Sequence, residues 1–132
     1  MSSHVHFDHC YPFSSFLPKA TALFGPGSID HVKPGWPATD SPYFSELVDP
    51  SHPWHSNVHE LPSKEDKRWK PFGTFDHAWD LFGDGSFWII DAPGHIAGNV
   101  AAAGRLKSGE WVIMGGDCCH SLYHTFMRRE LS

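Results

Sequence analysis

The sequence predicts an α+β fold that is mostly an antiparallel β meander, with short helices and a long irregular insertion. Between residues 75 and 114, short β-prone runs alternate with Gly-rich turns, a spacing typical of a meander. Between residues 33 and 70, six prolines exclude long regular elements and indicate a surface insertion. Because 132 residues with 40% hydrophobic content suffice for one core, we expect a single domain over residues 1–132.

The N-terminal quarter of the chain predicts short elements only. Residues 1–10 read as a loop that carries polar side chains, and residues 12–18 as a short helix bounded by prolines. The apolar run 20–24 ends at Gly25-Pro26-Gly27, which predicts a short buried strand. Ser28 or Asp30 can then open a brief helical turn.

The insertion at residues 33–70 is irregular in its sequence but not purely polar. Loops of this length without their own structure are usually functional or disordered. Four aromatic side chains in it indicate that it packs against the rest of the molecule, and a lid over a pocket is one role it could have: Trp36, Tyr43, Phe44 and Trp54.

The C-terminal half predicts the meander itself. The Asp-Gly turn at 83–85 supplies the positive φ angles of a tight hairpin, and 107–109 is a second turn. The expected strands are residues 75–82, 86–91, 99–106 and 110–114. Leu122, Phe126 and Leu131 have rough helical spacing, which predicts a short helix within residues 121–132.

Metal-binding side chains are concentrated at the start of the chain. His4, His6, Asp8 and His9 fall within six positions, a density that core and surface patterns do not require. The predicted loops near residues 95 and 117 each add one donor, His95 and Asp117. Imidazole and carboxylate suit zinc, manganese, iron or cobalt, and one short loop can serve two ions about 3.5–4 Å apart.

Composition excludes some classes of protein. A net charge of −5 without a basic cluster argues against a nucleic-acid surface, and no apolar run is long enough for a membrane span. The three cysteines do not form a disulfide framework, so a cytoplasmic location is the default expectation.

The order of these motifs resembles the metallo-β-lactamase superfamily: His4-x-His6-x-Asp8-His9, then Pro93-Gly94-His95, then Gly115-Gly116-Asp117. Residues 82–86 and 114–120 further resemble its lactonase-like, fungal-type branch. The resemblance implies a partial αββα sandwich with metal ions at the edge of the sheets. It places His4, His6 and His95 on a first metal, Asp8 and His9 on a second, and Asp117 between them, with one or two zinc ions expected.

The resemblance also implies the chemistry. A metal-bound hydroxide would attack a lactone, lactam or related ester carbonyl of a small molecule, with Asp8 passing a proton to the leaving atom. The branch often has a tyrosine three positions after the bridging aspartate, and His120 stands there and could donate the same hydrogen bond. A thioesterase acting on an acyl carrier or CoA thioester would use the same site.

The chain departs from the superfamily pattern at both ends. The scaffold that usually precedes the first motif, and a further histidine well downstream of Asp117, are not in the 132 residues, so the sequence resembles a central segment of the fold. His120 and His124 lie close to Asp117, and neither is excluded as the equivalent of that histidine. We therefore keep a different class open, a non-catalytic remnant with partial or no metal binding. An open sheet edge and an exposed apolar face are expected, which favours self-association.

Overall fold

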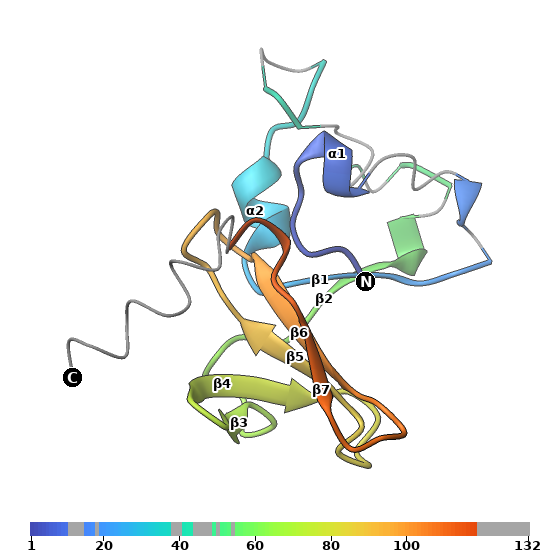
Figure 1. The fold of residues 1–132 in the computed structure, drawn as a ribbon. Helices are drawn as coiled ribbons and strands as arrows, with labels where there is room; N and C mark the ends of the chain where they lie inside the picture. Colours follow the sequence, from blue (N-terminus) through green and yellow to red (C-terminus); the bar gives the residue numbers. More distant parts are fainter. Residues whose placement is uncertain are drawn as a thin grey trace.

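The structure, a computed structural model, describes residues 1–10, 15–17, 19–37, 41–43, 49, 51–53 and 55–118. Two sheets and several short helices make up this part of the chain (Figure 1). A parallel pair joins β1 (Ala22–Phe24) to β2 (Val58–Glu60), and a five-stranded antiparallel sheet has the order β3-β4-β5-β6-β7. The mostly antiparallel sheet and the few short helices confirm the predicted α+β class, a partial metallo-β-lactamase-type arrangement.

The five-stranded sheet contains all four strands that the meander predicts. They are β4 (Phe75–Asp80), β5 (Phe87–Asp91), β6 (Val100–Arg105) and β7 (Trp111–Met114). A fifth strand, β3 (Lys70–Phe72), was not predicted, because Pro71 at its centre reads as a strand breaker. β3 is tolerated because it lies at the edge of the sheet, where a missing N–H donor costs no ladder bond.

The turns determine where the chemistry can gather. Gly83 and Gly85 have φ angles of 75° and 73°, and the carboxylate of Asp80 accepts hydrogen bonds from both their N–H groups at 3.0 and 2.9 Å. In an antiparallel meander, alternate connections lie at the same end of the sheet. This hairpin therefore lies at the same end as the one between β6 and β7. The β5–β6 connection and the end of β7 meet at the opposite end, as Figure 1 shows.

The sheet is buried on both faces at its centre, which explains the small side chains of β6. Ala78, Trp88, Ile90, Ala101 and Ala103 form one cluster. Because neighbouring residues of a strand point to opposite faces, Ile89 and Val100 belong to another, together with Leu61 and Trp69 from the end of the insertion.

The prediction of an irregular insertion over residues 33–70 is wrong at residues 55–60, where regular structure forms. A 3₁₀ turn, η3 (His55–Asn57), leads directly into β2. Val58 is buried and pairs with Ala22, and the N–H of Leu61 donates to the carbonyl of Phe24 at 2.8 Å. Burial of two apolar side chains beside β1 thus outweighs the loop-like composition around them.

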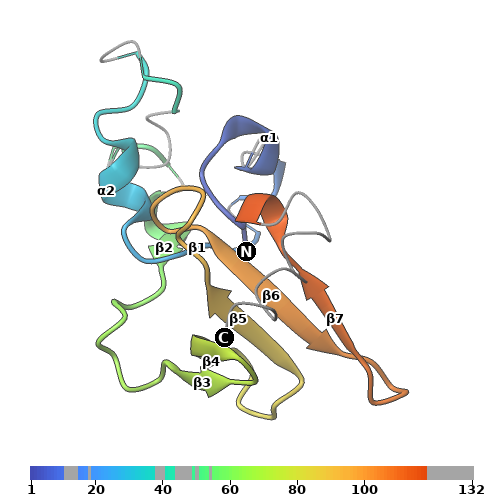
Figure 2. The ribbon, with the colours of Figure 1, turned by 60° about the vertical axis from the view of Figure 1, so that its left-hand side comes forward.

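The N-terminal segments form a third cluster beyond one end of the large sheet. The helices α1 (Phe7–Cys10) and α2 (Ser28–Val32) lie there with β1 and β2, and α1 adjoins the short helix η4 (Gly116–Cys118) (Figure 2). The core of this part consists of Val5, Cys10, Leu17, Ala22, Phe24, Val32, Val58 and Ile96.

The predictions for short elements have mixed outcomes. The strand within residues 20–24 and the helical turn opening at Ser28 are confirmed. The expectation of a loop throughout residues 1–10 is wrong at its end, because the carbonyl of His6 accepts bonds from the N–H groups of His9 and Cys10 and closes the turn of α1. The predicted helix at 121–132, and most of that at 12–18, fall outside the described residues.

The strand β7 lies at the free edge of the sheet as described. Trp111, Val112, Ile113 and Met114 are all exposed, with fractions from 40% to 57%. Within the described residues, no helix has the length and apolar character needed to cross a membrane.

Candidate metal centre

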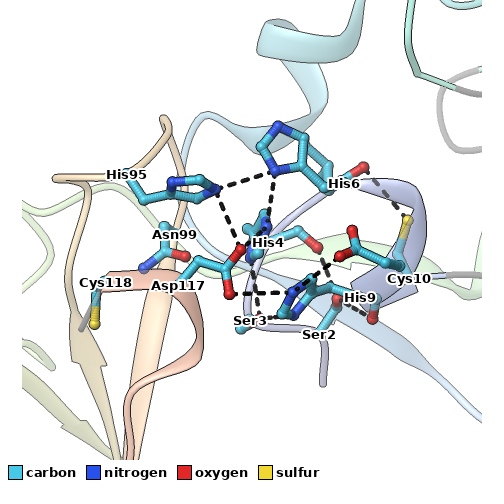
Figure 3. Close-up of polar contacts among 12 residues, drawn as sticks. Ser2, Ser3, His4, His6, His9, Cys10, His95, Asn99, Asp117 and Cys118 are labelled. Atoms are coloured by element: carbon cyan, nitrogen blue, oxygen red, sulfur yellow. Dashed lines mark hydrogen bonds and ion pairs between the residues drawn. The ribbon is translucent and has the colours of Figure 1, made fainter. Parts of the chain in front are cut away.

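Three segments bring the predicted donors to one end of the sheet. The first is the N-terminal segment, which bridges β1 and β6: the N–H of Ser2 donates to the carbonyl of Leu23 at 3.2 Å, and the N–H of Val100 donates to the carbonyl of Ser3 at 2.8 Å. The second is the β5–β6 loop that carries His95, and the third is η4, which carries Asp117. Figure 3 shows their side chains converging.

Four donors form a compact group: His4, His6, His95 and Asp117, with one donor atom of each within 4.8 Å of all the others. His6 Nδ1 lies 2.9 Å from His4 Nε2 and 3.1 Å from His95 Nε2. Asp117 Oδ2 lies 3.8 Å from His4 Nε2 and 3.7 Å from His95 Nε2.

These spacings fit a single small divalent cation. Ligands held tetrahedrally at the usual zinc–nitrogen distance are separated from one another by about 3.3 Å. The four separations in the structure fall on both sides of that value. Three imidazoles and one carboxylate are also the ligand types that such ions prefer.

The electrostatic state of His4 suits metal binding. Its side chain is fully buried, and burial lowers the pKa of His4 from 6.5 to about 4, with the neighbouring His9 and His6 adding to the effect. Asp117 opposes this shift. The imidazole is therefore neutral at pH 7, so that no proton has to be displaced from it by a metal ion.

Asp117 also faces a second pair of donors. Its other oxygen, Oδ1, lies 3.2 Å from His9 Nε2, and Asp8 Oδ2 lies 3.7 Å from the same nitrogen. The carboxylate thus has one oxygen towards His4 and His95 and the other towards His9 (Figure 3). Asp8 is the most exposed of these residues and touches the group only through His9.

Two serines that the sequence reasoning missed orient the motif. The hydroxyl of Ser3 lies 3.1 Å from both His4 Nδ1 and His9 Nδ1, the ring nitrogens that face away from Asp117. The hydroxyl of Ser2 donates to the carbonyls of His4 and His9 at 2.8 and 3.0 Å. The only signal in the sequence is their position directly before His4.

The loop that carries His95 is closed by Asn99, a fully buried residue. The N–H of Asn99 donates to the carbonyl of Ile96 at 3.0 Å, and its side-chain amide donates to the carbonyl of Ala92 at 2.7 Å. Gly98, with φ 74°, lies so close to Ser28 that a Cβ there would be 2.0 Å from the serine Oγ. The loop is therefore fixed against the start of α2.

The predicted site residues are distributed as follows. The structure brings His4, His6, His95 and Asp117 together and places His9 beside Asp117, with Asp8 one contact further out. His120 lies outside the described residues.

Comparison with known proteins finds several similar fungal proteins. It is 40% identical over 121 residues to the cytochrome P450 monooxygenase mpaDE' of Penicillium brevicompactum, in a match that covers 89% of this chain and 14% of that protein. It is 38% identical over 120 residues to the metallo-hydrolase mfmC of Annulohypoxylon moriforme, covering 89% of this chain and 30% of the relative. For the gamma-lactamase MBL2 of Gibberella moniliformis the identity is 32% over 121 residues, with 89% of this chain and 48% of the relative covered.

The chain thus spans from about one seventh to about half of the length of these relatives. No protein-family profile matches it, and no solved structure matches it significantly. Relatives named metallo-hydrolase and gamma-lactamase match the chain, and its described residues contain a His/Asp group that could hold a metal ion. These relatives support a member of the metallo-β-lactamase superfamily.

Proposed function

We propose that this member of the metallo-β-lactamase superfamily supplies the metal centre of a hydrolase that attacks the carbonyl carbon of a lactone, lactam or related ester. The observation that carries the proposal is the group of four donors, His4, His6, His95 and Asp117, at spacings suited to one cation. The relatives named metallo-hydrolase and gamma-lactamase support the reaction class. Zinc is the metal we propose, with manganese, iron or cobalt as substitutes that the same donors accept.

The roles of the residues follow from their positions. His4, His6 and His95 would hold the first cation, and His9 and Asp8 would hold a second, with Asp117 shared between them. When bound, a divalent cation supplies a Lewis acid for the carbonyl oxygen and lowers the pKa of water towards neutrality. Ser3 keeps His4 and His9 oriented through their remote ring nitrogens, so that the opposite nitrogens face Asp117.

Proton transfer falls to Asp8 in this proposal. Its carboxylate is 59% exposed and lies beside His9, so it can accept a proton at the site and deliver it to the leaving oxygen or nitrogen. His120 stays a predicted hydrogen-bond donor to the substrate carbonyl.

The first test measures metal binding by the chain. Zn²⁺ titration followed by calorimetry, with metal analysis after dialysis, is expected to give one or two ions per chain. His95→Ala is expected to weaken binding at least about tenfold. His77→Ala, which removes an exposed imidazole on β4, is the matched control and is expected to bind like the original chain. A chain that binds no divalent metal would contradict the proposal.

The second test measures turnover. The chain is assayed against panels of lactones, γ-lactams and thioesters, before and after treatment with a chelator. Turnover of a lactone or lactam that is lost on chelation and restored by Zn²⁺ is the expected result. Faster turnover of thioesters would move the assignment to a thioesterase, and turnover that survives chelation would exclude a metal-dependent mechanism.

A further inference from the structure

One aromatic side chain of the insertion lies beside a donor of the candidate metal centre. The phenol ring of Tyr43 is stacked on the imidazole of His6, with ring centroids 5.9 Å apart and an interplanar angle of 10°. The rings of His4 and His95 approach the same imidazole edge-on, with centroids at 4.7 and 4.9 Å. The His6 ring thus lies nearly parallel to the ring of Tyr43, while two other donors meet it at Nδ1.

Tyr43 is itself held from two directions. Its hydroxyl lies 3.0 Å from His31 Nε2 in α2. Its carbonyl accepts a hydrogen bond from the N–H of Trp36 at 2.7 Å, and its N–H donates to the hydroxyl of Ser41 at 3.2 Å. The ring also packs against the N-terminal hydrophobic cluster. These contacts fix the ring before any ligand binds.

The helix that holds Tyr43 is connected to the rest of the centre. The carboxylate of Glu60, on β2, accepts a hydrogen bond from the N–H of Ile29 at the start of α2. The hydroxyl of Ser28 donates to the carbonyl of Gly98 in the loop that carries His95. Tyr43 and the His95 loop are thus positioned by the same short helix.

His6 gains more from such support than the buried His4 does. Unlike His4, which is fully buried, His6 is only partly buried, and its Nδ1 is the atom shared by two contacts in the donor group. A partly exposed ring that rotates about its side-chain bonds would lose that alignment.

We propose that Tyr43 is a positioning residue of the metal centre, which holds the His6 imidazole in its metal-binding orientation and joins the 33–70 insertion to the site. The inference rests on the proposed function, since it assigns a purpose to the His6 orientation. Groups that orient metal ligands commonly change metal affinity by 10–100-fold when removed, and a stacking contact without a hydrogen bond to the ligand belongs at the lower end.

The test compares three substitutions that separate the ring from the hydroxyl. Tyr43→Phe keeps the ring and removes the bond to His31, so its Zn²⁺ affinity is expected to stay within about threefold of the original value. Tyr43→Leu keeps apolar bulk against the core but removes the stack, and Tyr43→Ala removes both. Both are expected to lower Zn²⁺ affinity about tenfold. Phe82→Ala, which removes an exposed aromatic ring at the far hairpin, is the matched control and should change nothing.

Two spectroscopic readouts separate positioning from general loss of structure. In the Co²⁺-loaded chain, Tyr43→Leu is expected to shift the visible absorption bands of the metal, while Tyr43→Phe leaves them in place. In the metal-free chain, loss of the stacked ring is expected to move the NMR resonances of the His6 imidazole, while the urea midpoint changes little.

The outcomes distinguish this inference from the proposed function. If the original chain binds no divalent metal, the proposed function fails, and the His6 resonances in the metal-free chain still decide whether Tyr43 orients that ring. Unchanged His6 resonances in Tyr43→Leu would overturn the inference, as would Zn²⁺ affinity equal to that of the original chain. An equally large effect of Phe82→Ala would also overturn it.

Discussion

Acidification of the metal-free chain should lower its stability, because His4 is buried in the folded state. Burial lowers the pKa of this imidazole from 6.5 to about 4, and the neighbouring imidazoles of His9 and His6 lower it further than Asp117 can raise it. The folded chain therefore keeps His4 neutral over a pH range in which the unfolded chain protonates it. As pH falls from 6.5 to about 4, protons bind preferentially to the unfolded state, and stability is lost.

The size of the loss follows from the size of the shift. Each unit of pKa difference corresponds to about 1.4 kcal/mol. The interval between 6.5 and about 4 thus corresponds to a loss on the order of 3 kcal/mol from His4 alone. The full contribution is present above pH 6.5, and no further loss from this group is expected below pH 4.

Two measurements check this. An NMR titration of the His4 imidazole in the metal-free chain is expected to give a midpoint near 4. Urea unfolding between pH 4 and 7 is expected to show a steeper pH dependence for the original chain than for His4→Gln, by about 3 kcal/mol over the interval. His77→Gln, which removes an exposed imidazole, should leave the pH dependence unchanged. A His4 midpoint near 6.5, or equal pH dependence with and without His4, would refute the reasoning.

Three further predictions concern packing and reactivity. Ile89→Ala is expected to cost about 2–5 kcal/mol of unfolding free energy by urea titration, because Ile89 is fully buried; a loss below about 1 kcal/mol would contradict that burial. Burial raises the pKa of the Cys10 thiol to about 11, so its alkylation at pH 8 should be far slower in the folded chain than in urea; equal rates would show an accessible thiol. The exposed edge strand β7 is expected to promote self-association that rises with concentration in light scattering and falls in Ile113→Lys, and a monomer at every concentration would exclude this.

The sequence predicted the large sheet because the signals for it are local. Strong β-prone runs such as Phe87–Asp91 are separated by Gly-rich turns whose positive φ angles only glycine adopts freely. Alternation along a strand also anticipates burial, as Trp88 and Ile89 pack on opposite faces. β3 and β2 escaped prediction because their formation depends on partners elsewhere in the chain. A strand of three residues can form where it pairs with a neighbouring strand.

The donors were predictable for a different reason. His4, His6 and Asp8 are dense enough in sequence to stand out, and resemblance linked them to His95 and Asp117. The residues that hold the donors in place gave no such signal in the sequence. Ser2 and Ser3 act through hydroxyl groups that any surface loop could carry, and their effect appears only once the chain folds back between β1 and β6.

Tyr43 shows why the role of an insertion is difficult to predict from its sequence. Its sequence neighbourhood, rich in Pro and Ser, indicates a loop and says only that an aromatic ring must pack somewhere. The partner, His6, lies 37 residues earlier (43 − 6) and the second partner, His31, belongs to a helix of five residues. Neither pairing follows from local periodicity.

The candidate metal centre also lies where two parts of the molecule are joined. His4 and His6 belong to the N-terminal segment beside α1 and α2, while His95 and Asp117 extend from the five-stranded sheet. The same junction is held by the bond from the N–H of Val100 to the carbonyl of Ser3 and by the close approach of Gly98 to Ser28. Glycine at position 98 permits this approach, because a Cβ there would meet both the hydroxyl and the backbone of the serine. A cation bound by donors from both parts would therefore strengthen a contact that packing has already made. The geometry of the donor group consequently depends on residues that are not themselves among the four donors.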